Sequence, residues 1–278
     1  MGNVLGAGSA RKMKTSLEDT VQYRMVVGDV EVPLNQYLGS TIHLSFNGVI
    51  NCIHCDRKTS KSFNQGYCYP CFKRLAQCDS CIVSPEKCHS DQGTCREPEW
   101  GETHCMIDHI VYLANTSGVK VGITRGSQVP TRWMDQGATQ AKPIFRVDSR
   151  HHSGMVEVLF KQRVADRTNW QAMLKGDAAD LDLEQVRLDL LADCRDDLDG
   201  LRERHGLQAI TELEDADETR IRYPVTSYPE KVKSLNLDKT PTIGGTLAGI
   251  KGQYLIFDTG VINIRKYGGY NLTLSLES

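Results

Sequence analysis

The chain has 278 residues, 40% of them apolar and 24% charged, which allows one large core or two to three small ones and excludes a wholly disordered protein. No apolar run reaches the roughly 18 residues of a membrane span, and the N-terminus MGNVLGAGSARKMK lacks an apolar signal core, so we expect a cytoplasmic protein without membrane insertion. The net charge of −2 is unevenly divided, because residues 120–167 carry nine Lys or Arg against four acids, whereas residues 176–222 carry six Arg against fifteen acids.

Residues 1–50 form the first predicted segment, and their pattern is typical of β-structure. Two β-prone runs, 22–27 and 30–34, flank a Gly-Asp turn, and apolar residues alternate from Ile42 to Phe46. The following Asn47-Gly48 predicts a turn. We therefore expect a small sheet or part of a barrel.

Cysteine dominates residues 51–107, the second predicted segment. Ten cysteines in a chain with no export signal indicate metal-binding thiols rather than disulfides. Four of them have the spacing C-x2-C-x12-C-x2-C, in which each pair bends around one tetrahedral ion. This spacing predicts a structural zinc site with no open position for catalysis, held by Cys52, Cys55, Cys68 and Cys71.

A second group of cysteines follows with a less regular spacing. We expect it to bind a second zinc ion through Cys78, Cys81, Cys88 and Cys95. An iron–sulfur cluster is the alternative, because four thiolates also satisfy its iron atoms. A different hypothesis makes this group a redox or metal sensor that changes partner binding when it is oxidised or loses its ion.

Basic and aromatic side chains alternate around the first four cysteines. Such a mixture can contact phosphates and stack on bases. Alternatively, the aromatic residues pack a small zinc core under a solvated basic face. The residues are Lys58, Lys61, Phe63, Tyr67, Tyr69, Phe72, Lys73 and Arg74.

Residues 108–175 change to a mixed pattern of strands and helices. A hairpin is predicted first, followed by a helix after Pro130, a strand and a second helix. The predicted order β-β-α-β-α has the bounds 110–114, 119–124, 131–137, 144–147 and 153–165.

Three strings in this segment, HIVY at 109–112, KVGITR at 120–125 and PTRW at 130–133, resemble the core of GIY-YIG nucleases. In that family a tyrosine ends the first hairpin strand, Y-I-G-x-T lies on the second, an arginine lies on the next helix and a later glutamate binds the metal. The residues that match in type and order are Tyr112, Gly122, Thr124, Arg132 and Glu157. Lys120 stands where the second tyrosine is usual, as it does in a phage-associated branch that reads K-[VI]-G-x-T.

The resemblance implies metal-dependent hydrolysis of phosphodiesters. Tyr112 would orient or deprotonate water, Arg132 and Arg125 would hold the phosphate, and Glu157 would bind one Mg²⁺ or Mn²⁺. Lys120 would add positive charge or lower the pKa of Tyr112. Structural roles remain open as well, with Tyr112 as a packing residue and Glu157 as the ion-pair partner of Lys161.

The last two predicted segments are residues 176–222, which are acidic and helical, and residues 223–278, which are rich in glycine and alternating apolar residues. Between Leu181 and Arg204 the apolar spacing predicts one amphipathic helix with Cys194 buried on its apolar stripe. LSFNGVIN at 44–51 is similar to LIFDTGVIN at 255–263. Both fit strand-turn-strand, so the chain ends are either related halves of one β-module or similar by chance.

Strings along nearly the whole chain, among them KSFNQGYCYPC, GTCREPEW, TNWQAMLKG and GIKGQYLIFDTGVINIRKYGGY, resemble an uncharacterised bacterial family described only as a domain of unknown function of the 2797 type. This resemblance implies an architecture and a bacterial origin but no activity. The predicted fold class is α+β, with a GIY-YIG-like α/β core, a cysteine-rich zinc module and β-rich ends.

The predicted function is zinc-containing nucleic-acid binding, to DNA or RNA, with divalent-metal-dependent endonuclease activity. The main alternative is a non-catalytic nucleic-acid or protein-binding module that keeps a degenerate nuclease fold, because Lys120 departs from the family pattern and the chain is not strongly basic.

Overall fold

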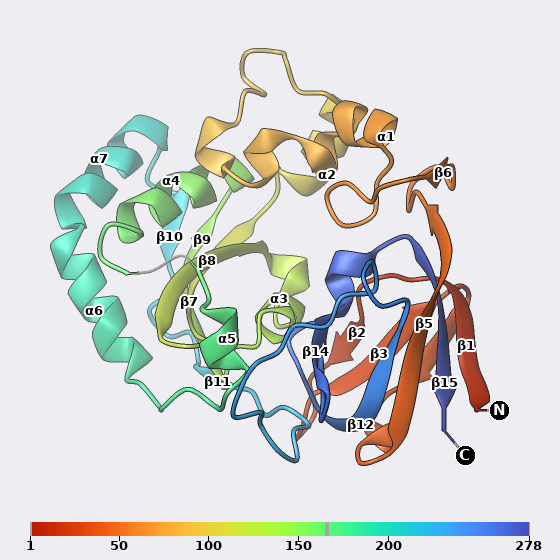
Figure 1. The fold of residues 1–278 in the computed structure, drawn as a ribbon. Coiled ribbons are helices and arrows are strands. Elements are labelled where there is room, and N and C mark those ends of the chain that lie inside the picture. Colours follow the sequence, from red (N-terminus) through yellow and green to blue (C-terminus); the bar gives the residue numbers. More distant parts are fainter. Residues whose placement is uncertain (1, 165–166, 278) are drawn as a thin grey trace.

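The computed structural model describes residues 2–164 and 167–277. Three antiparallel sheets and seven α-helices make up this part of the chain (Figure 1). The fold is therefore α+β, as predicted. None of the described helices has the length and apolar character needed to cross a bilayer.

The largest sheet joins the two ends of the chain. Its strands lie in the order β1 (Asn3–Ser9), β15 (Tyr270–Leu276), β5 (Thr41–Asn51), β12 (Thr242–Lys251), β13 (Tyr254–Phe257) and β14 (Gly260–Asn263), with the short β6 (Lys58–Thr59) against β5. A small sheet of β2 (Lys14–Ser16), β3 (Gln22–Val27) and β4 (Val30–Pro33) shares its apolar core. We call these two sheets together the β-module. The predicted strands at 22–27 and 30–34 are confirmed.

The predicted turn at Asn47-Gly48 is wrong, because β5 runs straight through it. Gly48 has a positive φ of 77°, and the pairing of β5 with β15 shifts register between Tyr270 and Leu272. These features mark a bulge, which bends a strand without reversing it. Residues 255–263 do form a hairpin, of β13 and β14. The two similar strings therefore fold differently, although both chain ends lie in one sheet.

The second sheet carries the predicted β-β-α-β-α order. Its strands are β10 (Ile210–Glu212), β9 (Gln140–Val147), β7 (His109–Asn115) and β8 (Val119–Arg125), in that order, and β11 (Thr219–Arg220) also pairs with β9. Its helices are α3 (Thr131–Asp135), α4 (Arg150–Phe160), α5 (Trp170–Met173), α6 (Leu183–Asp193) and α7 (Arg195–His205). We call this the α/β module. The helix predicted at 153–165 is α4, which starts earlier and ends at Phe160, and Ala165 lies outside the described residues.

Alternating side chains of β7 face two different cores, as the period of a strand requires. Val111 and Leu113 pack with α4, α6 and α7 on one face. Tyr112 and Ala114 pack on the other face, in the core shared with the β-module. The sheet is thus covered on both sides, and Tyr112 lies on the side of the β-module.

The acidic segment forms two helices where one was predicted. The chain turns at Cys194, which has φ −110° and ψ 12°, so α6 ends there and α7 begins. The apolar stripe itself is confirmed, since Leu190, Cys194 and Leu201 are all buried against the α/β sheet. The Cys194 thiol is the buried structural side chain that was expected.

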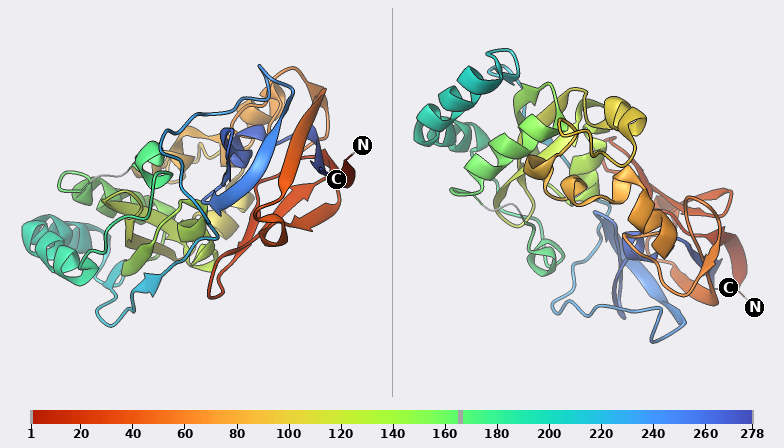
Figure 2. Two further views of the ribbon diagram at one scale, coloured as in Figure 1. Left: turned by 60° about the horizontal axis from the view of Figure 1, so that its bottom comes forward. Right: turned by 90° about the horizontal axis from the view of Figure 1, so that it is seen from above.

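Residues 51–107, which we call the cysteine module, have little regular structure. Apart from β6 they contain the short helices α1 (Tyr69–Arg74) and α2 (Pro98–His104) and several 3-10 turns. The module lies across both other modules, next to α4 at one end and β5 at the other (Figure 1), and Figure 2 shows the same arrangement from two further sides.

Candidate functional site

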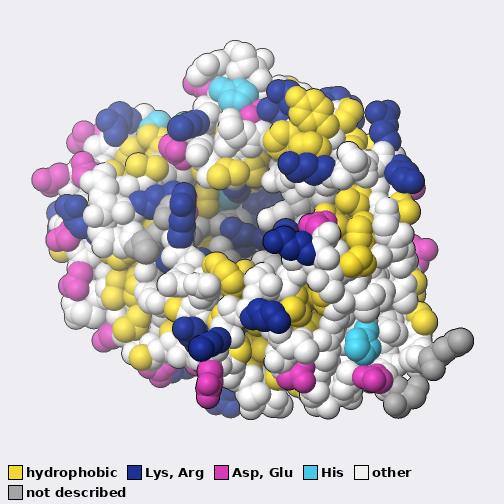
Figure 3. Space-filling view, viewed as in Figure 1, with side chains coloured by type: hydrophobic (Ala, Val, Ile, Leu, Met, Phe, Trp, Pro, Cys, Tyr) yellow, Lys and Arg dark blue, Asp and Glu magenta, His cyan; other side chains and the backbone are white. Residues whose placement is uncertain are grey.

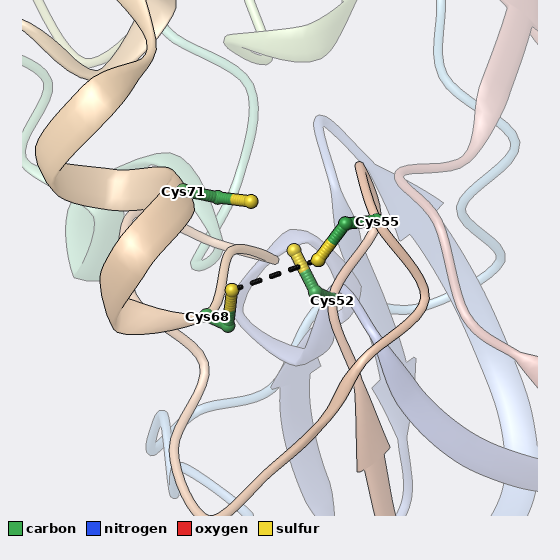
Figure 4. A group of neighbouring side chains, drawn as sticks. All are labelled: Cys52, Cys55, Cys68 and Cys71. Carbon is green, nitrogen blue, oxygen red and sulfur yellow. Dashed lines mark hydrogen bonds between the residues drawn. The ribbon is translucent and has the colours of Figure 1, made fainter.

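The first four cysteines form one compact cluster. The Sγ atoms of Cys52, Cys55, Cys68 and Cys71 all lie within 4.8 Å of one another, and they point toward a common centre (Figure 4). Cys52 and Cys55 come from the turn after β5, where Asp56 N–H donates to the carbonyl of Cys52 (2.9 Å). Cys68 precedes α1 and Cys71 lies in it. The cluster is compatible with the tetrahedral four-thiolate site predicted from the spacing.

The electrostatics of this cluster favour a bound cation. Burial raises the pKa of the Cys52 thiol, but backbone N–H groups of Cys68, Cys55 and His54 outweigh it and bring the pKa to about 6. Burial and the neighbouring thiols raise the pKa of Cys71 to about 12. Four thiolates therefore cannot coexist here at neutral pH unless a positive ion offsets their mutual repulsion.

The apolar core around the cluster is small. Its buried members are Leu75, Cys78 and three cysteines of the cluster, Cys52, Cys68 and Cys71. Tyr67 and Phe72 pack against them. Two further aromatic rings lie outside this core. Phe63 is half-buried and stacks on Phe72, with the ring centroids 5.7 Å apart, and Tyr69 is 55% exposed. Tyr67 and Phe72 thus have the packing role that one of the two expectations gave to the aromatic residues. A core this small is typical of domains whose fold depends on a metal.

The second cysteine set is not assembled as predicted. Cys78 is buried in the core of the first cluster. In the part of the chain that the structure describes, the other group of converging ligand atoms is that of Asp79, Cys81 and His89. The spacing alone gave no sign that Cys78 packs with the first cluster while Cys81 lies with Asp79 and His89.

A cavity of about 720 Å³ lies where the three modules meet. The α/β module supplies β8, α3 and α4, the cysteine module supplies the loops around Asn64 and Ile82, and the β-module supplies Arg11 and Arg265. Figure 3 shows a hollow in the centre of this face with Lys and Arg side chains around it. Segments distant in sequence therefore enclose one space.

Positive charge dominates the described lining of this cavity. Two of its side chains are acidic, Asp135 and Glu157. Seven are basic: Arg11, Lys12, Lys120, Arg125, Arg132, Arg150 and Arg265. The excess of cations makes the cavity suited to a ligand with several negative charges.

The excess of positive charge in the cavity also affects the pKa values of neighbouring groups. Burial lowers the pKa of Arg265, and the nearby Arg132 lowers it further. Burial likewise lowers the pKa of His109 to about 4, helped by Arg150 and Arg125. Burial is the larger cause of both shifts, and the neighbouring cations add to it.

The five predicted catalytic residues all lie at this cavity. Lys120 and Arg125 on β8, Arg132 on α3 and Glu157 on α4 line it. Tyr112 is fully buried in the wall behind them. Its hydroxyl donates to Oε1 of Gln136 (2.9 Å), a lining residue, and the Arg132 guanidinium lies beside it.

Burial raises the pKa of Tyr112 to about 12, although Arg132 and the hydrogen bond to Gln136 act in the opposite direction. The phenol is therefore protonated at neutral pH. In this arrangement Tyr112 is suited to donating a hydrogen bond and is poorly suited to deprotonating water. Of the two roles implied by the resemblance, orientation fits better.

Gly122 allows Tyr112 to reach this position. The two residues pair directly across β7 and β8, and a Cβ on Gly122 would lie 2.7 Å from both Cζ and Oη of Tyr112. The tyrosine ring thus covers the glycine. This contact gives a physical reason for the glycine in the KVGIT string.

Gly122→Ala is expected to destabilise the protein by about 1–3 kcal/mol, because the added methyl group must displace a buried ring. Chemical denaturation measures the loss. Gly126→Ala is the matched control, since a Cβ there meets no atom within 4 Å among the described residues. Equal stability of the two variants would contradict the role given to Gly122.

Both cavity carboxylates have basic partners. Asp135 binds Nζ of Lys12 (2.7 Å) and accepts a hydrogen bond from Gln253 (2.8 Å). Glu157 lies 3.3 Å from Nζ of Lys161, one helical turn on. The ion pair considered from the sequence is thus present, and the Glu157 side chain, 12% exposed, still lines the cavity.

Comparison with known protein families assigns the chain to one of them. Residues 39–272 match the sequence profile described as Protein of unknown function (DUF2797). The chain belongs to the DUF2797 family. Searches of curated proteins and of solved structures found no match. The matched range contains the whole cysteine module and all cavity residues named above except Arg11 and Lys12.

Sequence reasoning missed several cavity residues of this DUF2797 chain. Arg150 donates to the carbonyl of Ile82 (2.6 Å) and lines the cavity beside it. Arg11 donates to the carbonyl of Ile53 (2.9 Å), and Arg265 comes from the far end of the chain. Their places in sequence, more than 100 residues apart, gave no signal. Only the meeting of the three modules brings them together.

Proposed function

We propose that this protein binds nucleic acid through the cavity and hydrolyses a phosphodiester bond there. The observation that carries the proposal is the convergence of Lys120, Arg132 and Glu157, chosen from the sequence alone, on one strongly basic cavity. Guanidinium groups suit phosphate oxygens because they donate two parallel hydrogen bonds.

The arrangement of elements supports the GIY-YIG-like reading. Tyr112 lies on the first hairpin strand, Lys120 to Thr124 on the second, Arg132 on the next helix and Glu157 on a later one. The order of these elements is the one that the resemblance implies, although Tyr112 lies in the middle of β7 and not at its end. The central position of β7 between β8 and β9 directs Tyr112 and β8 toward the same cavity.

The chain's own residues have distinct tasks in the proposed reaction. Arg132 and Arg125 bind the phosphate, Lys120 adds positive charge beside it, and the protonated Tyr112 orients the attacking water or the phosphate. Glu157 provides one carboxylate, which suits a Mg²⁺ or Mn²⁺ ion that takes its other ligands from water and substrate phosphate. That ion would supply Lewis-acid activation of the phosphate.

The cysteine module contributes zinc and a binding platform. The Cys52–Cys71 cluster binds one structural zinc ion, and the exposed Tyr69 and the basic residues around it contact nucleic acid next to the cavity. Asn64 and Gln65 of the same module line the cavity. Zinc thus positions the substrate, whereas the proposed chemistry belongs to the α/β module.

A non-catalytic binding module is the second candidate. Two observations favour it: Glu157 is already paired with Lys161, and the raised pKa of Tyr112 removes a general base. Binding without cleavage on every substrate tested would select it.

Arg132→Ala is expected to weaken binding of labelled single-stranded DNA or RNA about tenfold, the cost of one charge-assisted phosphate contact. It is also expected to flatten the dependence of log Kd on log salt by about 0.7, the value for one phosphate contact on a single strand. Fluorescence anisotropy at several salt concentrations measures both.

Arg146→Ala is the matched control for this experiment. Arg146 lies on β9 of the same sheet, is 55% exposed and does not line the cavity. Its replacement is expected to leave affinity and salt slope unchanged. Equal effects of the two variants, or no binding by the unmodified protein, would refute the proposed cavity.

A further inference from the structure

The segment from residue 79 to residue 107 has almost no apolar core. None of the hydrophobic clusters formed by described residues includes a member of this segment. Its regular structure consists of the 3-10 turns Ser80–Ile82 and Pro85–Lys87 and the helix α2. A segment of this length needs another source of order, and metal ligation is the usual one.

Four half-buried thiols occur in this segment, and none is in a disulfide. They are Cys81, Cys88, Cys95 and Cys105. Cys105 ends α2, where its N–H donates to the carbonyl of Gly101 (2.7 Å). The Sγ atom of Cys95 lies over the same glycine, 3.6 Å from the place of a Cβ there. Cys95 and Cys105 are therefore neighbours across one helical turn.

Helix α4 brings the other two cysteines to the same place. Arg150 binds both sides, because its N–H donates to the carbonyl of Cys105 (2.7 Å) and its Nη2 donates to the carbonyl of Ile82 (2.6 Å), the residue after Cys81. Gly154 of α4 lies directly against the turn before Cys88, where a Cβ would be 2.5 Å from the backbone N of Glu86.

These thiols also lie within electrostatic range of one another. Cys88, Cys95 and Cys105 all act on the Cys81 thiol, and Cys88 and Cys95 act on the Cys105 thiol. Cys78 lies apart from them, since it packs with the first cluster.

The converging group of Asp79, Cys81 and His89 is a weaker candidate for a metal site. The Asp79 carboxylate already binds Nε of Arg96 (2.7 Å) and accepts the N–H of Ser80 (2.6 Å). A guanidinium at this distance repels a cation. Asp79 therefore anchors Arg96 and caps a turn.

We propose that Cys81, Cys88, Cys95 and Cys105 form a second metal site, which takes one zinc ion with four thiolate ligands. Cys105 thus replaces Cys78 in the set expected from the spacing. The four Sγ atoms are less tightly grouped than those of the first cluster. No three of them lie within 4.8 Å of one another, so more than one of these cysteines must change its rotamer when the ion binds.

Such a site would order one wall of the cavity. Ile82 and Pro85 lie between the ligands Cys81 and Cys88 in the sequence, and both line the cavity. Arg150, which donates to the carbonyl of Ile82, lines it too. The second zinc would thereby fix the part of the cysteine module that faces β8 and α4.

Zinc content tests the proposal on the full-length protein. Inductively coupled plasma mass spectrometry is expected to find about two zinc ions per chain in the unmodified protein, about one in Cys105→Ser and about two in Cys78→Ser. Cys78→Ser is the matched control, because it removes the cysteine that the spacing predicted as a ligand and that the proposed site leaves out. One zinc per chain in the unmodified protein, or loss of zinc in Cys78→Ser but not in Cys105→Ser, would overturn the assignment.

X-ray absorption at the zinc edge of the unmodified protein provides a measurement that needs no variant. The expected result is an average first shell of four sulfur atoms at about 2.3 Å. Nitrogen or oxygen in that shell would point to His89 or Asp79 and contradict the four-thiolate site. Iron with acid-labile sulfide would likewise exclude zinc at this position.

Discussion

Replacing Cys68 with serine is expected to remove one zinc equivalent and to unfold residues 51–78, while the β-module apart from β6 stays folded. Cys68 is 2% exposed and its Sγ is one of four within 4.8 Å of one another. Structural zinc contributes on the order of 10 kcal/mol in small zinc domains, and among the described residues Leu75 is the one buried member of this core besides cysteines. Zinc analysis and hydrogen exchange of residues 51–78 measure the two effects.

Cys194→Ser is the matched control for that experiment. Cys194 is also buried, at 3% exposure, but lies between α6 and α7, far in sequence from the cluster. The change is expected to cost about 1–3 kcal/mol for the buried hydroxyl and to leave zinc content unchanged. A Cys68→Ser protein that keeps all its zinc and its exchange protection would rule out the structural zinc site.

The local elements of this protein were largely predictable because their signals are local. The alternation in β3 and β4, the hairpin of β7 and β8, and the paired C-x2-C units depend on residues close in sequence. Errors arose where a local signal has two outcomes. Asn-Gly usually marks a turn, but Gly48 with its positive φ equally accommodates a bulge when β12 and β15 pair on both sides of the strand.

The cavity was predictable only in part, for a related reason. Tyr112, Lys120, Arg125, Arg132 and Glu157 fall within fifty residues and fit one recognisable order. Arg11 and Arg265 join them only because β1 and β15 lie side by side in the β-module. The ligand set predicted for the second group of cysteines differs from the structure for the same reason. Which cysteines lie near Cys81 depends on how α4 packs against the 3-10 turns of the cysteine module.

Glu157→Gln is expected to reduce cleavage by about a hundredfold to a thousandfold while leaving nucleic-acid binding unchanged or slightly stronger. Loss of a metal-binding carboxylate removes stabilisation of the charge that develops at the phosphate. Removing a negative charge from a cavity with seven basic side chains does not weaken attraction to phosphate. The measurement uses labelled single-stranded, duplex and branched DNA and RNA with Mg²⁺ or Mn²⁺, followed for both binding and cleavage.

Lys161→Met separates this role from a structural one. It removes the ion pair that Glu157 makes at 3.3 Å but keeps the carboxylate. If Glu157 serves the reaction, this variant retains cleavage, because the carboxylate that would bind the metal ion is still present. If both variants lose cleavage equally, Glu157 acts through the helix and not through the phosphate. If the unmodified protein binds and never cleaves, the cavity belongs to a binding module, and the replacement of the second tyrosine by Lys120 marks the loss of the chemistry.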